Sequence, residues 1–177
     1  MRSIVVSSAL AMAMLFPHGT ASRDFPAGWR LPTTEEMADP LRRKSPDSFA
    51  KATADFNGDG IPDQAFLLKS VASSGEGLWV RLSNAEADFS WLKLHEIKWD
   101  QTYPTVGLAM AVEALPPGDY PYICFEDGKD CDVGPPGERQ KLKLRDPSLM
   151  HFKLDSAASL FFWSRRHTKF MRVWLSD

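Results

Sequence analysis

From Phe49 onward the chain is a series of short runs rich in β-branched and aromatic residues, separated by clusters of Gly, Pro, Asn and Asp. Runs of this kind are typical of β-strands joined by turns. Several runs alternate apolar and polar residues, as Lys141 to Arg145 does, which indicates strands with one buried face. The predicted strands cover residues 49–54, 64–70, 77–82, 91–99, 106–115, 120–125, 140–145, 149–154, 159–163 and 169–175.

The connections between these runs predict how the strands pair. Residues 73–76, 116–119, 134–137 and 146–148 consist of Ser, Gly, Pro, Asp and Glu, and such short turns favour antiparallel pairing of consecutive strands. No segment repeats at a fixed period, which argues against a solenoid or a full propeller. The sequence therefore predicts a mainly β fold, an antiparallel meander that forms a sandwich or a small barrel-like sheet.

Residues 1–21 are typical of a cleavable signal peptide. Arg2 is followed by an apolar run over residues 4–16, by Pro17, and by small residues that end at Ala21, after which we expect the cut. The run is shorter than the roughly 20 apolar residues that a membrane helix needs. We therefore expect a protein exported across a bacterial inner membrane, periplasmic or secreted, without membrane insertion.

The remaining chain divides into an N-terminal extension, residues 22–48, and a β-rich domain, residues 49–177. One short helix is predicted in the extension, because Thr33 and Glu36 have the spacing of a capping box and Pro40 would end the helix. The formal charge of the chain is −2, and its basic and acidic residues are interspersed. This balance argues against general binding to nucleic acid or to anionic membranes.

Cys124 and Cys131 are the only cysteines. In an oxidising compartment a close pair predicts a disulfide, which would fix a local turn. A zinc site would need further Cys or His residues at ligand spacing, and none is near. A nucleophilic Cys124 working with His151 or His167 is the less favoured alternative.

Residues 55–63 carry the one pattern that points to a metal. Asp55, Asn57, Asp59 and Asp63 offer side-chain oxygens at alternate positions, and Ile61 offers its backbone carbonyl. Ca²⁺ takes six to eight oxygen ligands, so we expect these five residues to hold calcium, with Gly60 supplying the sharp turn. The alternative is a tight loop of Asx turns that binds nothing.

The loop is not an EF-hand, because position 12 of that motif requires Glu and Phe66 stands there. Residues 54–68, an Asp-Phe-Asn-Gly-Asp-Gly-Ile-Pro-Asp stretch and the apolar strand after it, instead resemble the calcium loop of the FG-GAP and VCBS repeat families. In those families the loop links two antiparallel strands, and the resemblance implies the same here. A single copy does not imply a propeller. Residues 120–131 and 156–177 resemble small exported proteobacterial proteins of unassigned function.

No sequence motif for catalysis is present, whether a nucleophile elbow, a zinc-protease helix or a phosphate loop. The sequence therefore favours binding over catalysis, with Arg165, Arg166 and His167 as a basic hairpin tip that meets another protein. The hypothesis is a non-enzymatic periplasmic calcium-binding protein that binds another macromolecule, one version being an inhibitor or immunity-type protein against a cell-wall-directed enzyme. The alternatives are a secreted hydrolase with a dispersed active site and a structural calcium module of the cell envelope.

Overall fold

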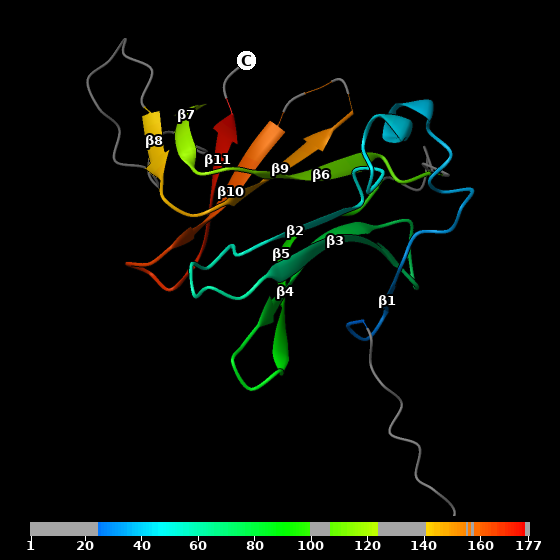
Figure 1. The fold of residues 1–177 in the computed structure, drawn as a ribbon. Helices are drawn as coiled ribbons and strands as arrows, with labels where there is room; N and C mark the ends of the chain where they lie inside the picture. Colours follow the sequence, from blue (N-terminus) through cyan, green and yellow to red (C-terminus); the bar gives the residue numbers. More distant parts are fainter. Residues whose placement is uncertain (1–24, 100–106, 124–140, 155, 157, 176–177) are drawn as a thin grey trace, which may run out of the picture.

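The computed structural model describes residues 25–99, 107–123, 141–154, 156 and 158–175, which form two antiparallel sheets (Figure 1). Sheet A contains five strands and sheet B contains six. The strands of sheet A are β1 (Trp29–Arg30), β2 (Lys51–Ala54), β3 (Asp63–Ser70), β4 (Glu76–Ser83) and β5 (Phe89–Ile97). Those of sheet B are β6 (Met110–Leu115), β7 (Gly118–Ile123), β8 (Lys141–Leu144), β9 (Ser148–Lys153), β10 (Ala158–Ser164) and β11 (Lys169–Leu175).

In sheet A the strands pair in sequence, as predicted, from β2 through β3 and β4 to β5. The short strand β1 was not predicted. It lies in the N-terminal extension and pairs with the end of β3 through Trp29 and Ser70, beyond the part of β3 that pairs with β2.

In sheet B the strand order is β6-β9-β10-β11-β7-β8, so the predicted meander is only partly right. Strands β9, β10 and β11 form consecutive hairpins. The turn at residues 116–119 does not join paired strands, because β6 pairs with β9 while β7 pairs with β8 and β11. Pro116 and Pro117 lack the backbone N–H that would close a hairpin there. The turn at residues 146–148 likewise joins strands that have other partners, and residues 134–137 lie outside the described residues.

The core lies between the two sheets. Alternate residues of β3 and β4, such as Leu67 and Val80, meet alternate residues of β6, β9 and β10, such as Val112, Leu149 and Phe161. All five side chains are at most 3% exposed. Neither sheet closes into a barrel in the part of the chain that is described, so the barrel-like alternative is wrong.

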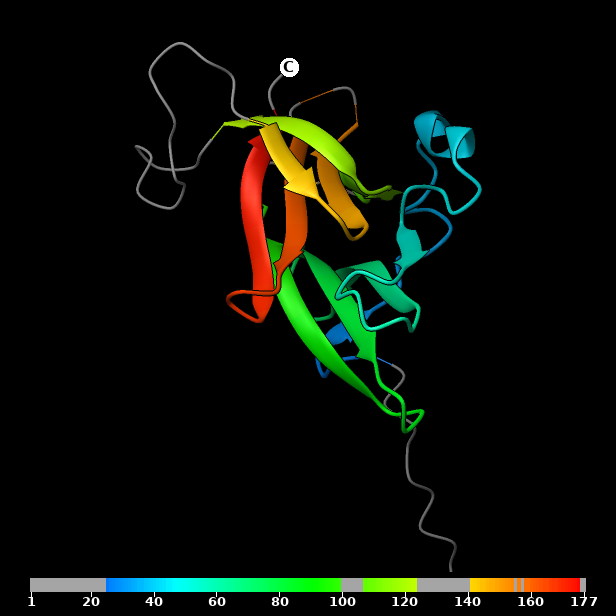
Figure 2. The ribbon, with the colours of Figure 1, turned by 60° about the vertical axis from the view of Figure 1, so that its left-hand side comes forward.

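Sheet B also buries part of its opposite face. Leu160 and Val173 are direct partners across β10 and β11, and they are 0% and 5% exposed although they point away from the main core. Strand β8 curls over this face (Figure 2). Its side chains Leu142 and Leu144 line one hollow together with Phe162 of β10. The curl gives sheet B a second, smaller core.

The predicted capping box forms, but the predicted helix does not. Thr33 N donates to Glu36 Oε2 over 2.8 Å and Glu36 N donates to Thr33 Oγ1 over 3.3 Å. Pro40 has no N–H with which to continue the turn, and its ring forces Asp39 into an extended conformation. The next element is therefore a 3₁₀ helix, η1 (Pro40–Lys44), and the described residues contain no α-helix. None of their helices is long and apolar enough to span a bilayer.

Buried charges attach the chain before β6 to sheet A. The Glu76 carboxylate accepts hydrogen bonds from Trp99 Nε1 (3.0 Å), Ala109 N (2.8 Å) and Met110 N (3.0 Å). Lys69 Nζ lies 3.4 Å from the same carboxylate, and both side chains are at most 4% exposed. Removing either charge would leave the other buried without its partner.

Candidate functional site: the acidic loop between β2 and β3

The acidic loop, residues 55–62, connects β2 and β3, whose end residues Ala54 and Asp63 are cross-strand partners. Phe56 is 0% exposed and belongs to the core, so it fixes the loop to sheet A. Gly58 and Gly60 have φ angles of 72° and 89°, a region that glycine enters without steric cost. The two glycines make the tight curl that the sequence predicts.

Hydrogen bonds from the backbone hold the acidic side chains of the loop. Asp55 Oδ1 accepts from the N–H groups of Gly58 (2.8 Å) and Asp59 (3.1 Å), and Asp55 Oδ2 accepts from Gly60 (2.8 Å). Asp59 Oδ1 accepts from Ile61 N over 2.8 Å. Asn57 donates from Nδ2 to Asp59 Oδ2 over 2.9 Å. These are Asx-type contacts, in which short side chains satisfy the backbone of the loop.

Asp63 closes the loop from the first position of β3 and is 0% exposed. Its Oδ2 accepts from Phe56 N (3.0 Å) and its Oδ1 from Ser83 N (2.9 Å), so the carboxylate joins the loop to the end of β4. Burial raises the pKa of Asp63, and the nearby charge of Asp59 raises it further. The hydrogen bonds from the backbone N–H groups of Ser83 and Phe56 lower it. A cation near these carboxylates would offset that repulsion.

The loop fits calcium by the chemistry of its donors, which are all oxygens. A carboxylate oxygen has two lone pairs. Each carboxylate oxygen of Asp59 and Asp63 accepts one of the hydrogen bonds described above, so it keeps a lone pair for a metal ion. In the described residues, however, no three His, Cys, Asp or Glu side chains form a ready metal-binding cluster. The structure therefore places the five predicted ligands on one curl, with the side chains turned to backbone donors.

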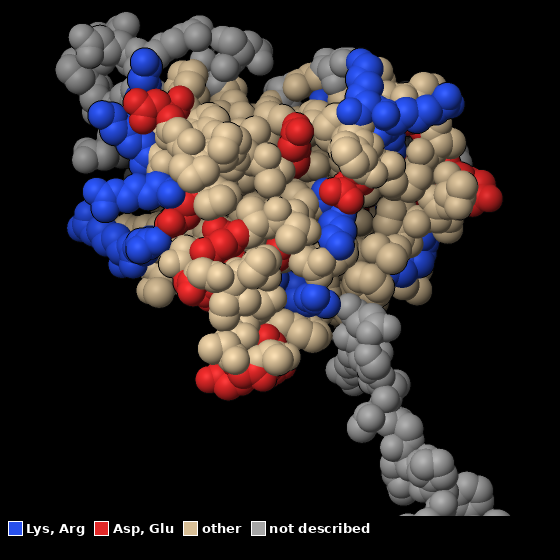
Figure 3. Space-filling view, in the orientation of Figure 1, with Lys and Arg blue, Asp and Glu red and all other residues tan. Residues whose placement is uncertain are grey.

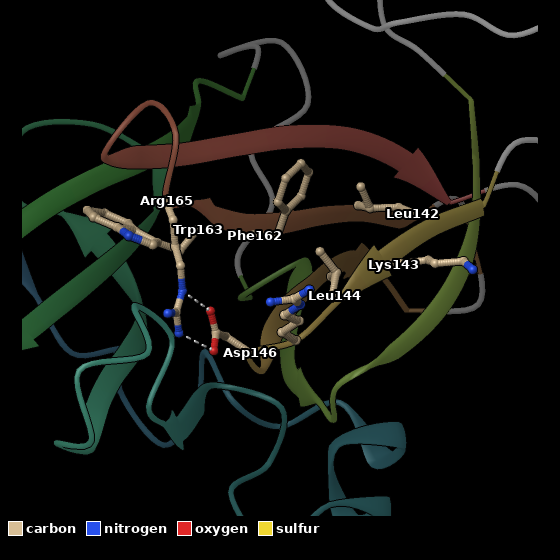
Figure 4. Close-up of a pocket in the computed structure, with 8 residues that line it drawn as sticks. Leu142, Lys143, Leu144, Asp146, Phe162, Trp163 and Arg165 are labelled. Carbon is tan, nitrogen blue, oxygen red and sulfur yellow. Dashed lines mark hydrogen bonds and ion pairs between the residues drawn. The ribbon is translucent and has the colours of Figure 1, made fainter.

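Arg165, predicted as a partner-binding residue, contacts this loop. Its guanidinium makes two hydrogen bonds with Asp146, from Nε to Oδ2 (2.9 Å) and from Nη2 to Oδ1 (2.8 Å) (Figure 4). Nη2 also lies 3.4 Å from the carbonyl oxygen of Gly58. A Cβ atom on Gly58 would collide with Arg165 Nη2, so glycine is required for this contact. The hairpin tip of sheet B thus rests on the acidic loop of sheet A.

The other two residues of the tip, Arg166 and His167, are exposed. Figure 3 shows Lys and Arg side chains next to Asp and Glu side chains on the side of the molecule where the tip and the acidic loop lie in Figure 1. Arg165 is exposed as well, but its guanidinium is paired with Asp146, so Arg166 and His167 are the part of the predicted surface that is better placed to meet a partner.

Comparison of the chain with protein-family models found no match, and comparisons with curated proteins and with solved structures found none either. The loop resemblance to FG-GAP and VCBS repeats therefore stays a prediction.

Two predictions lie outside the described residues. These are the disulfide between Cys124 and Cys131 and the signal peptide at residues 1–21.

A histidine pair was missed by the sequence analysis, which placed His95 and His151 on separate strands. Their rings are 5.4 Å apart across the two sheets, at an interplanar angle of 78°. Burial lowers the pKa of both rings, that of His151 to about 3. The charges of His95 and Arg172 lower the pKa of His151 further, and that of Arg172 lowers the pKa of His95. No local pattern could have shown this pair, because β5 and β9 belong to different sheets.

Ser159 is the direct cross-strand partner of His151, which brings a hydroxyl next to an imidazole. Both residues are nearly buried, at 2% and 3% exposure, and Arg172 donates from Nε and Nη2 to Ser159 Oγ. A substrate could not reach this serine without opening the sheets, so the pair is a structural contact.

Proposed function

We propose that the protein is a non-enzymatic, calcium-binding protein of the periplasm that acts by binding another protein, built on a two-sheet sandwich. The observation that carries the proposal is the acidic loop. It places Asp55, Asp59 and Asp63 on one glycine-shaped curl between two antiparallel strands. The charge of Asp59 acts on the Asp63 carboxylate, and a cation near both would offset that repulsion.

Calcium would be held by Asp55, Asn57, Asp59, Asp63 and the carbonyl of Ile61, and it would neutralise the charge of the loop. Asp63 joins the loop to the end of β4 within sheet A, because it accepts from Ser83, and Arg165 of sheet B contacts the loop at Gly58. Occupancy would therefore stabilise the β2–β3 hairpin and the sheet junction. Extracellular-type sites bind calcium at roughly 10⁻⁴ to 10⁻³ M, which suits a structural ion.

Binding is favoured over hydrolysis because Ser159 and His151, which are cross-strand partners, are both buried. An inhibitor or immunity-type protein against a cell-wall-directed enzyme is the version of the proposal that suits a small exported protein. A purely structural calcium module is the version without a partner.

The test is affinity purification of the tagged protein from the exported fraction of its native host, in millimolar calcium and in excess chelator. The proposal expects one protein at equal stoichiometry that is retained in calcium and lost in chelator. Turnover of cell-wall or ester substrates by the purified protein alone would overturn it in favour of the hydrolase. Purification of the protein without a partner under both conditions would leave only the structural module.

A further inference from the structure

The outer face of sheet A does not have the composition of a solvent-facing sheet. An antiparallel sheet with one face on the core is expected to carry polar residues on the other. Here the residues that alternate with the core positions include Phe66 on β3, Trp79 on β4, and Phe89 and Trp91 on β5. Phe25 and Trp29 of the N-terminal extension pack on part of this face, but Phe89 stays 39% exposed. Aromatic side chains at positions expected to be polar are typical of a functional surface.

The strand register sets these side chains in rows. One row runs straight across four strands as Lys51, Phe66, Trp79 and Lys93, a ring pair between two cations. The next row places Arg81 beside Trp91.

The aromatic rings of this face pack in two groups, one around Trp91 and one of Trp29 with Trp79. Phe66 and Trp91 lie 5.6 Å apart by ring centroid, Phe89 and Trp91 6.1 Å, and Phe25 lies within 6.1 Å of both Phe66 and Trp91. Trp29 from β1 packs on Trp79 at 5.4 Å. We call these six rings and the cations Lys51, Arg81 and Lys93 the aromatic face. Phe89 is 39% exposed, and the other five aromatic side chains are half-buried.

Each cation of the aromatic face lies over a ring. Lys51 Nζ lies 5.6 Å from the Phe66 centroid, Arg81 Cζ lies 4.9 Å from the Phe89 centroid, and Lys93 Nζ lies 5.7 Å from the Trp79 centroid. Cation–π contact of this kind fixes a charged group without neutralising it. Lys51 and Arg81 therefore keep N–H donors for an acceptor outside the chain, while the Lys93 ammonium, which pairs with Glu96, has three donors in all.

The charge of the face differs in sign from that of the whole chain. Among the outer-face positions of β2 to β5 as described, Glu96 is the acidic one, and it pairs with Lys93 over 2.5 Å. Lys51 and Arg81 leave an excess of positive charge there, although the chain carries −2. An acidic surface complements this face.

The ring geometry decides what kind of acidic partner fits. Sugars and nucleobases stack on ring faces. Here neighbouring rings are tilted or edge-on, at 54° for Phe66 and Trp91 and 83° for Phe89 and Trp91, and cations cover ring faces. Such a surface lacks a flat stacking platform. Trp and Arg, however, are the residues that dominate the binding energy of protein interfaces.

We infer that the aromatic face is the surface through which this protein docks onto an acidic patch of a partner protein. The inference rests on the proposed binding function and assigns that function to sheet A. The rings supply the apolar contacts, and Lys51, Arg81 and Lys93 meet carboxylates at the partner's surface.

The test compares sheet A with sheet B in the full chain expressed in its native host. A photo-crosslinking amino acid replaces Phe89 in one strain, Ile123 in a second and His167 in a third. Ile123 is the matched control, because it is an apolar side chain of sheet B that is 58% exposed. The inference expects a discrete protein adduct from position 89 alone.

The captured protein is then purified, and its affinity for the wild type is compared with that for Phe89→Ser, Lys93→Glu, Ile123→Ser and Lys143→Glu. Phe89→Ser and Lys93→Glu in sheet A are each expected to weaken binding at least tenfold, and the two sheet B variants less than twofold. The affinity of the wild type should fall when the salt concentration is raised and when poly-glutamate is added. Melting temperatures identify any variant that loses its fold. If Lys93→Glu unfolds the protein, Phe89→Ser still tests the surface, because Phe89 is exposed.

The failures of the two proposals are distinguishable. An adduct from position 167 but not from 89 would leave the binding function standing and overturn this surface. Adducts to lipid or polysaccharide at position 89, or equal losses in the sheet A and sheet B variants, would also overturn it. No adduct from any position would overturn both proposals.

Discussion

The buried His151 and its half-buried neighbour His95 predict that stability falls in mild acid. His151 is 3% exposed, and its pKa is lowered to about 3 by burial and by the charge of His95, with Arg172 adding to the effect. In the unfolded chain the imidazole regains its ordinary pKa of about 6.5. Between these values the unfolded state binds a proton that the folded state does not bind.

The sign and size of the effect follow from this difference. A group whose pKa is lower in the folded state makes stability rise with pH, so stability is at its full value above about pH 6.5 and falls on acidification toward the folded value. The slope for one group is about 1.4 kcal/mol per pH unit. For His151 alone, the free energy of unfolding at pH 5 should be about 2 kcal/mol lower than at pH 7. His95, whose pKa is lowered in the same direction, adds to this loss.

The assay is urea unfolding followed by tryptophan fluorescence at pH 7, 6 and 5 and constant ionic strength. The wild type is compared with His151→Gln, which cannot titrate at this position. The variant is expected to be less stable at pH 7, but its loss between pH 7 and pH 5 should be smaller by about 2 kcal/mol. Parallel pH profiles for the two proteins would refute the reasoning, because they would show that His151 is protonated equally in the folded and unfolded states.

Three further predictions concern packing and charge. Gly77→Ala should lower the free energy of unfolding by about 1–3 kcal/mol, because a Cβ there would lie 2.7 Å from two tryptophan rings. Gly118→Ala is the control, because a Cβ there meets only ordinary contacts and should be tolerated. The urea midpoints of the two variants are compared. Glu76→Gln should lower the free energy of unfolding by about 3–5 kcal/mol, since it leaves the buried Lys69 without its charge partner. A loss below about 1 kcal/mol in urea unfolding would contradict the importance of that ion pair. Arg165→Gln and Asp146→Asn should lower the melting temperature equally, with no additional loss in the double variant, because each removes the same ion pair.

Local signals predicted the strands well. Each of the ten predicted strand regions contains a strand in the structure, because the alternation of residues such as those in Lys141–Leu144 and the turn residues between runs act within a few positions. The acidic loop was predictable for the same reason, since Asp55, Gly60 and Asp63 lie on one continuous segment.

Long-range features were not predictable from the sequence. The pairing of β6 with β9 depends on contacts between distant segments, and the register shift beside Trp79 in the β4–β5 pair has no local signal. The same holds for the contact of Arg165 with Gly58, which crosses from one sheet to the other. The aromatic face became visible only when the strand register placed rings from separate strands in rows.

The most direct test of the account is a calcium titration of the purified protein, followed by its melting temperature. With a dissociation constant of roughly 10⁻⁴ to 10⁻³ M, about 10 mM calcium should stabilise the fold by about 1.4–2.7 kcal/mol, which raises the melting temperature by several degrees. Asp59→Asn should abolish most of this shift, while Asp88→Asn, which changes an exposed acid outside the loop, should keep it. A melting temperature that does not respond to calcium, or a shift that Asp59→Asn retains in full, would contradict the claim that the acidic loop holds the ion.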